Sequence, residues 1–333
     1  METHDFSSPP PPASPPGPQP LYNRFLQAGR EGKNQWWRYI VGIVLTFIAG
    51  YSLIGAVPVL LLVLRGVLKG YFTLGQLQGN SQAVENPAFL HVSSNTLLAS
   101  LLFIFVAAMF FLWIAVRFVH KKRFLSIINY EGNRFDYRRF FVAAGIWTVI
   151  SIVAFAISYI SDPGNFQLVF RPGPFTGTLL ICLVMLPVQT GWEELFLRGY
   201  IMQGLGLWMK KPVWPLLITA VIFGLLHMQN EEVKANGALA MFPSYFLPGL
   251  VFGMIALLDE RLELAMGLHF ANNLFGILTV TSPDMSIQAN AIWKVSTIGN
   301  PSDIIGGALS LFLVLGILWR MYKWNAQKLL RAY

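Results

Sequence analysis

The sequence predicts an all-α, polytopic membrane helix bundle of about eight transmembrane helices with both termini in the cytoplasm. Its composition is the first reason, because 55% of the 333 residues are hydrophobic and only 12% are charged, whereas soluble domains carry about 25% charged residues. The second reason is a series of eight apolar segments, each about long enough to cross roughly 30 Å of hydrocarbon. The third is that positive charge alternates between the gaps that join these segments, which sets orientation in membrane proteins.

The chain begins with a Pro-rich stretch, which we expect to be a disordered cytoplasmic tail over residues 1–35. The run SPPPP at residues 8–12 and further prolines up to residue 20 make a semi-extended segment that buries little apolar area. No apolar core follows a basic start, so a signal peptide is not predicted. A Pro-rich ligand for a partner domain is an alternative, but a solvated tether is the preferred interpretation.

Residues 36–333 are predicted to form the membrane domain. We place its eight apolar segments at residues 39–64, 96–118, 140–160, 176–205, 212–229, 238–258, 264–281 and 303–322. The three segments within residues 39–160 carry few polar groups and are interpreted as scaffold helices. Chemistry is expected in a core at residues 175–281, and 303–322 is the last helix.

The positive residues predict the topology. The odd-numbered gaps, starting with the N-terminal arm, hold 18 Lys and Arg residues, and the other gaps hold five. Since cytoplasmic loops carry the excess of positive charge, both termini are predicted to be cytoplasmic. The charges lie between apolar runs and not along one face, so no nucleic-acid partner is expected. From the Pro-rich start and the short loops we predict a multi-pass protein of a bacterial inner (plasma) membrane, surrounded by the lipid bilayer.

Three charged residues lie inside the fourth apolar segment: Glu193, Glu194 and Arg198. An ionisable residue at membrane depth costs roughly 2.5–3.5 kcal/mol, so it marks a functional-site hypothesis. Glu194 and Arg198 are four residues apart with the acid first, the favourable order for an ion pair on one helix face. Glu193 lies about 100° further round the helix. We expect a structural Glu194–Arg198 pair and a reactive Glu193; a wet, functionless interfacial loop is the alternative.

Further polar residues lie in the fifth and seventh segments. His227 has apolar surroundings, as does His269, which shares a helix face with Asn273. At 1.5 Å per residue from the nearest cytoplasmic positive charges, Glu193 and His227 lie about 25 Å deep but His269 only about 12 Å. Tilt, a bent fourth segment or an embedded loop at 259–264 would have to absorb this difference. Any one of these residues could simply join helices; together they predict one polar interior.

Three short motifs on successive apolar segments resemble those of a known family. They are Glu193-Glu194-x-x-x-Arg198, Phe223-x-x-x-His227 and His269-x-x-x-Asn273. In these motifs the chain resembles the CPBP (CAAX protease and bacteriocin-processing, or Abi) family of intramembrane endopeptidases, relatives of the type II CAAX prenyl proteases. The resemblance covers roughly residues 175–280.

The resemblance implies an intramembrane endopeptidase that acts on a membrane-anchored protein or peptide. By analogy, Glu193 and His227 would activate a water for attack on a peptide carbonyl. His269 and Asn273 would face the developing oxyanion. The structural support would come from Glu194, Arg198 and Phe223.

The use of a metal stays open from the sequence. Glu193, His227 and His269 could form a zinc site with an open water position, and the resemblance implies either mechanism. The HExxH signature of soluble zinc proteases is absent, so we expect a metal-independent mechanism with no cofactor. Cys182 is the only cysteine, so no intrachain disulfide can form.

A second class of function also stays open from the sequence. The chain could be a non-proteolytic membrane protein on the same fold, either a partner-binding or immunity factor or a proton-coupled transporter, because proton relays also bury Glu and His. The sequence shows no inverted repeat of the kind found in many transporters.

Overall fold

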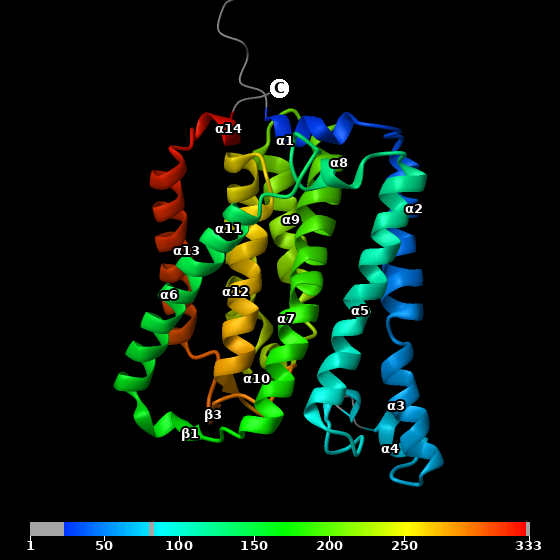
Figure 1. The fold of residues 1–333 in the computed structure, drawn as a ribbon, viewed down its shortest axis with the longest axis vertical. Helices are drawn as coiled ribbons and strands as arrows, with labels where there is room; N and C mark the ends of the chain where they lie inside the picture. The colour runs from blue at the N-terminus through cyan, green and yellow to red at the C-terminus, as the bar shows by residue number, and fades with distance from the viewer. Residues whose placement is uncertain (1–22, 80–82, 331–333) are drawn as a thin grey trace, which may run out of the picture.

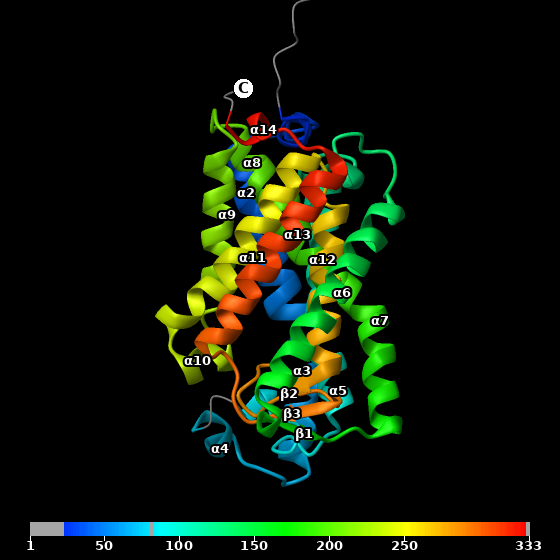
Figure 2. The same ribbon diagram turned by 90° about the vertical axis from the view of Figure 1, so that its left-hand side faces the viewer.

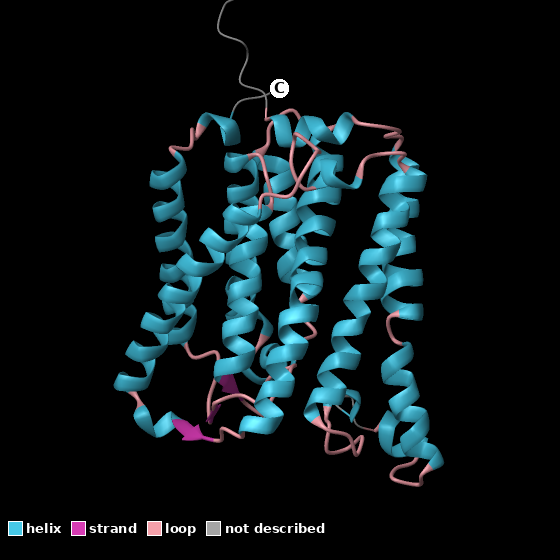
Figure 3. Ribbon diagram, in the orientation of Figure 1, coloured by secondary structure: helices cyan, strands magenta, loops and turns pink. Residues whose placement is uncertain are grey.

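The computed structural model describes residues 23–79 and 83–330, and this part of the chain is a bundle of long helices (Figure 1). The strands are short and lie together at one end of the bundle (Figure 3). The larger part of the predicted Pro-rich tail, residues 1–22, lies outside the described residues.

Six helical stretches of the described chain are long and apolar enough to cross a membrane, judged by length and composition. They are Trp36–Leu68, Ser94–Val119, Tyr137–Ser161, Pro172–Gly206, Ala238–Asp259 and Pro301–Tyr322. The fifth and seventh predicted segments form two shorter helices, α9 (Val213–Leu226) and α12 (Glu263–Thr279). All eight predicted segments are thus helical, and the prediction of a polytopic membrane helix bundle is confirmed.

Several of the long stretches contain π-helical turns, and short helices join them. The long stretches are built from α2 (Trp36–Val44), η2 (Leu45–Ile54) and α3 (Val57–Leu68); α5 (Ser94–Ile114) and η4 (Ala115–Val119); α6 (Tyr137–Ser161); α7 (Pro172–Glu194), η7 (Leu195–Met202) and α8 (Gln203–Gly206); α11 (Ala238–Asp259); and α13 (Pro301–Tyr322). The short helices are α1 (Arg24–Gln27), η1 (Ala28–Arg30), α4 (Leu74–Gln78), η3 (Ala83–Glu85), η5 (Phe124–Ile127), η6 (Pro163–Asn165), α10 (Glu231–Asn236) and α14 (Gln327–Leu330).

A small sheet adds a minor strand component to the predicted all-α fold. Its strands are β1 (Phe166–Leu168), β2 (Val280–Thr281) and β3 (Trp293–Val295), in the order β1-β3-β2. β1 pairs antiparallel and β2 parallel with the central β3. The sheet lies at the end of the bundle opposite α1 and α14 (Figures 1 and 2).

Both ends of the described chain are fixed at the same end of the bundle. Arg24 in α1 and Lys328 in α14 bind the same carboxylate, Glu260, at 2.8 Å and 3.1 Å. Phe25 and Leu26 are fully buried. Folded structure therefore begins by residue 23, so the predicted tail boundary at residue 35 is too late. A shared end for both termini agrees with an even number of crossings.

The core around the polar segments is formed by helices from several parts of the chain. α12 packs against α6 and α7, and α11 packs against α9 and α13, while α5 lies between η2 and α7. The turn from α11 to α12 is embedded: Leu262 and Glu263 are fully buried, and the Leu262 amide donates to the Ile128 carbonyl at 2.9 Å. Because this turn is embedded, α12 begins below the surface of the bundle. His269 therefore lies deeper than a count of residues from Arg261 predicts.

Gly267 allows the close approach of α12 to α6. A Cβ atom at this position would lie 2.2 Å from the Phe140 carbonyl oxygen, whereas a Cβ at Gly276 on the same helix would meet open space. We expect Gly267→Ala to lower the free energy of unfolding by about 1–3 kcal/mol, since overpacking forces backbone shifts. Thermal unfolding in detergent checks this, and equal melting of Gly267→Ala and Gly276→Ala would contradict it.

Candidate functional site

The polar residues predicted to converge line one cavity. It has a volume of about 700 Å³ and lies between α7, α9, α11 and α12, with η2 and α5 closing one side. Glu193, His227, His269 and Asn273 are all among its lining residues. Two segments expected to be scaffold also contribute, since Tyr51 of η2 and several residues of α5 line the same space.

The predicted ion pair forms at the end of α7. Arg198 lies one turn after Glu194, in the π-helical η7; its Nη1 is 3.1 Å from Glu194 Oε1, and both side chains are fully buried. Arg198 Nη2 also donates to the Gly249 carbonyl of α11 at 2.9 Å. Its guanidinium lies 4.9 Å from the Phe223 ring centroid. The pair therefore joins α7, α9 and α11, which is the supporting position predicted for Glu194, Arg198 and Phe223.

His269 lies beside both glutamates, a contact that helix spacing alone could not predict. Its Nδ1 is 2.9 Å from Glu194 Oε1, and its Nε2 is 3.6 Å from Glu193 Oε2. An ionised carboxylate only accepts hydrogen bonds, so Nδ1 carries the proton that it donates to Glu194. The Nε2 atom is thereby turned towards Glu193 and the cavity.

Glu193 has one paired and one unpaired oxygen. Oε1 accepts a hydrogen bond from Gln189 Nε2 at 2.5 Å. Oε2 is buried and has no hydrogen-bond partner within the described residues. Because burying a polar atom without a partner is unfavourable, this oxygen marks the place where a water or substrate group would bind.

Gln189 is a site residue that our sequence analysis missed. Asn273 Nδ2 donates to Gln189 Oε1 at 3.0 Å, so the Gln189 amide connects Asn273 of α12 to Glu193. The sequence spacing could have indicated this residue, since Gln189 precedes Glu193 by four residues and so shares one helix face with it. This amide fixes the orientation of the Asn273 side chain and of the Glu193 carboxylate together.

We expect Gln189→Leu to lower kcat by roughly 10²-fold with little change in KM, because small misplacements of catalytic groups have effects of this size. Steady-state kinetics on the purified protein would measure both. Gln203→Leu is the matched control, since Gln203 is also a buried amide of the same helical stretch but bonds the Ser126 carbonyl away from the cavity. Equal kcat in the two variants would contradict a positioning role for Gln189.

His227 caps the C-terminus of α9 and lines the cavity from the other side. Its Nδ1 bonds the Phe223 carbonyl at 2.7 Å, and its ring stacks on Tyr245 with centroids 4.5 Å apart. These contacts hold the ring and leave Nε2 for the cavity. Among the described residues, no hydrogen bond or ion pair joins His227 directly to Glu193. The partnership expected from the resemblance would therefore act across the cavity, through bound water or substrate.

A polar cluster follows His227 along the cavity. The Tyr245 hydroxyl donates to Glu232, which also accepts from the Ser286 hydroxyl at 2.9 Å. Burial raises the pKa of Glu232, but the hydrogen bonds from Tyr245 and Ser286 outweigh this and hold the pKa below its usual value. Glu232 is thus ionised at neutral pH and orients Tyr245, on which His227 stacks.

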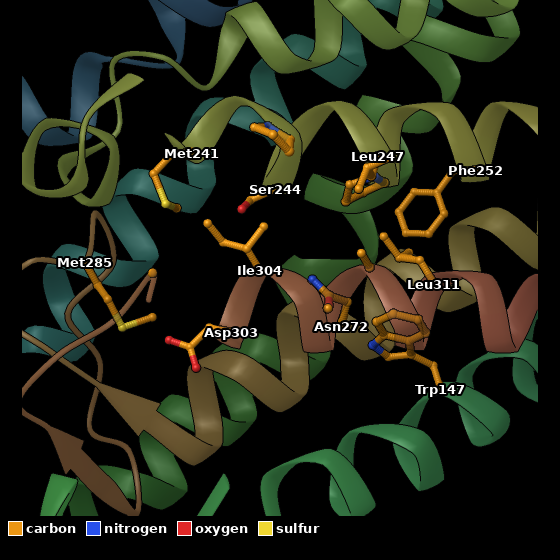
Figure 4. A pocket seen from close by; sticks show the side chains of 15 residues that line it. Trp147, Met241, Ser244, Leu247, Phe252, Asn272, Met285, Asp303, Ile304 and Leu311 are labelled. Atoms are coloured by element: carbon orange, nitrogen blue, oxygen red, sulfur yellow. The ribbon is translucent and has the colours of Figure 1, made fainter. Parts of the chain in front are cut away.

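A second, mostly apolar cavity of about 470 Å³ adjoins the first (Figure 4). In this view Met241, Ser244 and Leu247 of α11 lie opposite Ile304 and Leu311 of α13. Five residues line both cavities: Ser244, Pro248, Phe252, Asn272 and Met285.

The three residues considered as zinc ligands are not grouped for metal binding in this arrangement. No group of three or more His, Cys, Asp or Glu side chains within the described residues could hold a metal ion. One nitrogen of each histidine is already engaged, His269 Nδ1 with Glu194 and His227 Nδ1 with a carbonyl. A zinc site would need His227 and Glu193 to move together.

Comparison with known proteins supports the resemblance drawn from the motifs. Residues 175–275 match the family described as type II CAAX prenyl endopeptidase Rce1-like. The protein YyaK of Bacillus subtilis (strain 168), described as uncharacterized, is 27% identical over 275 residues, which cover 81% of this chain and 87% of YyaK. No solved structure matches the chain. The relationship predicted from the three motifs is confirmed.

Proposed function

We propose that the protein is an intramembrane endopeptidase, because residues 175–275 match the family described as type II CAAX prenyl endopeptidase Rce1-like. It hydrolyses a peptide bond of a membrane-associated substrate with a water activated by Glu193 and a histidine. One observation carries the proposal: Glu193 Oε2 is buried without a partner in the described structure, 3.6 Å from His269 Nε2, in a cavity of about 700 Å³. The membrane is proposed to be a bacterial inner membrane.

The reaction requires a group that accepts a proton from the water and a route by which this proton reaches the leaving amine. Glu193 Oε2 takes a proton from the water as its oxygen attacks the carbonyl carbon of the peptide bond. The proton then passes to the amine nitrogen as the carbon–nitrogen bond breaks, with His227 Nε2 on the opposite wall as the relay. All atoms balance without a covalent intermediate.

The oxyanion formed in this step requires hydrogen-bond donors. An Asn amide has two N–H groups, and Gln189 occupies one of those on Asn273, which leaves the second for the developing oxygen charge. His269, on the same helix face, is the other candidate donor; because its Nδ1 proton is given to Glu194, its Nε2 can donate to the oxyanion only in the doubly protonated imidazolium form. A donor of this kind contributes about 3–4 kcal/mol to transition-state stabilisation.

The test is a comparison of membrane proteomes from cells with the wild-type protein, cells with Glu193→Ala and cells with a full deletion. We expect at least one membrane protein to gain a new terminus only in the wild-type cells. If the deletion has a phenotype that Glu193→Ala lacks, and no new terminus is found, the protein acts by binding a partner or by transport instead.

We expect turnover to survive exhaustive chelation, because a carboxylate and a histidine suffice for this mechanism. The measurement is activity of a purified, metal-analysed sample before and after chelator treatment. Loss of activity that returns with added Zn²⁺ would instead assign Glu193, His227 and His269 to a metal site.

A further inference from the structure

The cavity leads from the catalytic residues to the end of the bundle opposite the chain termini. Below Glu193 and His269 its lining continues through Asn230 and Glu232, next to and within α10, and ends at Ser286 in the loop between β2 and β3. α10 and the strands lie towards the end opposite α1 and α14 (Figures 1 and 2). The cavity therefore extends towards that end.

The adjoining apolar cavity extends towards the same end of the bundle. It is lined by Met241 in the first turn of α11 and by Asp303 and Ile304 in the first turn of α13 (Figure 4). Both helices begin at the end that carries the small sheet and finish at the end that carries the termini. Both cavities thus occupy the same half of the bundle.

The end with the termini is closed above the catalytic residues. Glu194 and Arg198 are fully buried there, as are Leu257 and Leu262 around the embedded turn. Three polar links tie the covering segments to that turn. They are Asn23 Nδ2 to the Leu257 carbonyl at 2.9 Å, Arg24 to Glu260 at 2.8 Å and Arg261 to Glu131 at 2.5 Å. A peptide entering from this end would have to break these contacts.

The charge distribution identifies which end faces the cytoplasm. The gaps on the side of the termini hold 18 Lys and Arg residues, against five on the other side. Cytoplasmic loops carry the excess of positive charge. The closed end is therefore cytoplasmic, and the open end faces away from the cytoplasm.

We propose that the active-site cavity opens to the extracytoplasmic side of the membrane. The substrate class is then a peptide segment presented on that side, such as the extracytoplasmic juxtamembrane part of a membrane-anchored protein, and not a cytoplasmic tail. This substrate class rests on the proposed endopeptidase function. The direction of the cavity does not.

Single cysteines can report the side of the membrane directly. Cys182 is the only native cysteine and is buried, so Cys182→Ala gives a cysteine-free background. Gly276→Cys places a thiol within the cavity, where an added Cβ meets open space, and Gln229→Cys places one at an exposed position of its lining. Lys210→Cys, in the exposed loop between α8 and α9, is the control at the opposite end.

The probe is a membrane-impermeant maleimide added to intact cells and to permeabilised cells. We expect Gly276→Cys and Gln229→Cys to label equally in both, and Lys210→Cys to label only after permeabilisation. Should Gly276→Cys fail to accumulate, Gln229→Cys and Lys210→Cys still decide the orientation. Labelling of the cavity positions only after permeabilisation, or not at all, overturns the proposal.

This experiment is independent of catalysis. If Glu193→Ala cells still produced every new terminus, the endopeptidase function would fail, and the labelling pattern would stand unchanged. If the labelling pattern were reversed while Glu193→Ala abolished cleavage, the function would stand and its substrates would be cytoplasmic.

Discussion

Glu193→Gln is expected to lower kcat/KM by roughly 10²–10⁴-fold, the usual contribution of a positioned general base. Glutamine has nearly the shape of glutamate, and its oxygen can still accept the hydrogen bond from Gln189 that Glu193 Oε1 accepts at 2.5 Å. It cannot take a proton from water. The loss should therefore appear in kcat, and the free energy of unfolding should change little. Kinetics and thermal unfolding of the purified protein in a bilayer mimic measure the two quantities.

Glu263→Gln is the matched control for this variant. Glu263 is also a fully buried glutamate, but it bonds Asn129 and the Asp136 amide, away from the cavity. Its replacement should leave turnover unchanged even if some stability is lost. Full activity of Glu193→Gln would rule out water activation by this carboxylate.

Arg198→Ala is expected to have the largest effect on stability, a loss of about 3–5 kcal/mol in the free energy of unfolding. Removing one member of a buried ion pair leaves the other charge uncompensated, and here Glu194 would keep only His269. The Gly249 carbonyl would also lose its donor. Thermal unfolding in detergent or a bilayer mimic gives the measurement. Arg138→Ala, at an exposed position, should change stability by less than about 0.5 kcal/mol.

A double variant separates stability from activity at this pair. Replacing both charges, as in Glu194→Leu with Arg198→Met, removes the uncompensated charge and should restore much of the stability, since apolar replacements of buried pairs are often neutral. Activity should stay low, because His269 loses the Glu194 oxygen that holds its Nδ1 at 2.9 Å. An active double variant would show that this hydrogen bond is dispensable.

The features that the sequence predicted correctly are those set within one helix. The lengths of the apolar segments predicted the positions of all eight helices. A spacing of four residues predicted the ion pair between Glu194 and Arg198. Contacts between helices depend on tilt, rotation and local changes of helical period, which spacing does not encode. The contact of His269 with Glu194 and the link from Asn273 through Gln189 are of this second kind.

The depth of His269 illustrates why helix rise alone was insufficient. Counting from Arg261 assumed that this residue marks the membrane surface, whereas the turn that carries it lies under the loop between α5 and α6, paired with Asn129. The N-terminal boundary was misplaced for a similar reason. Phe25 and Leu26 are two apolar residues in a polar stretch, and their burial depends on a tertiary surface that local composition does not reveal.

The length of α9 has a consequence for the supply of the reacting water. Its 14 residues span about 21 Å at 1.5 Å per residue, well short of roughly 30 Å of hydrocarbon. Lipids beside a helix this short must thin locally or admit headgroups and solvent. We therefore expect the bilayer next to His227 to be thinned and accessible to water, and for the proposed endopeptidase we expect the turnover rate to change with the acyl-chain length of the surrounding lipid.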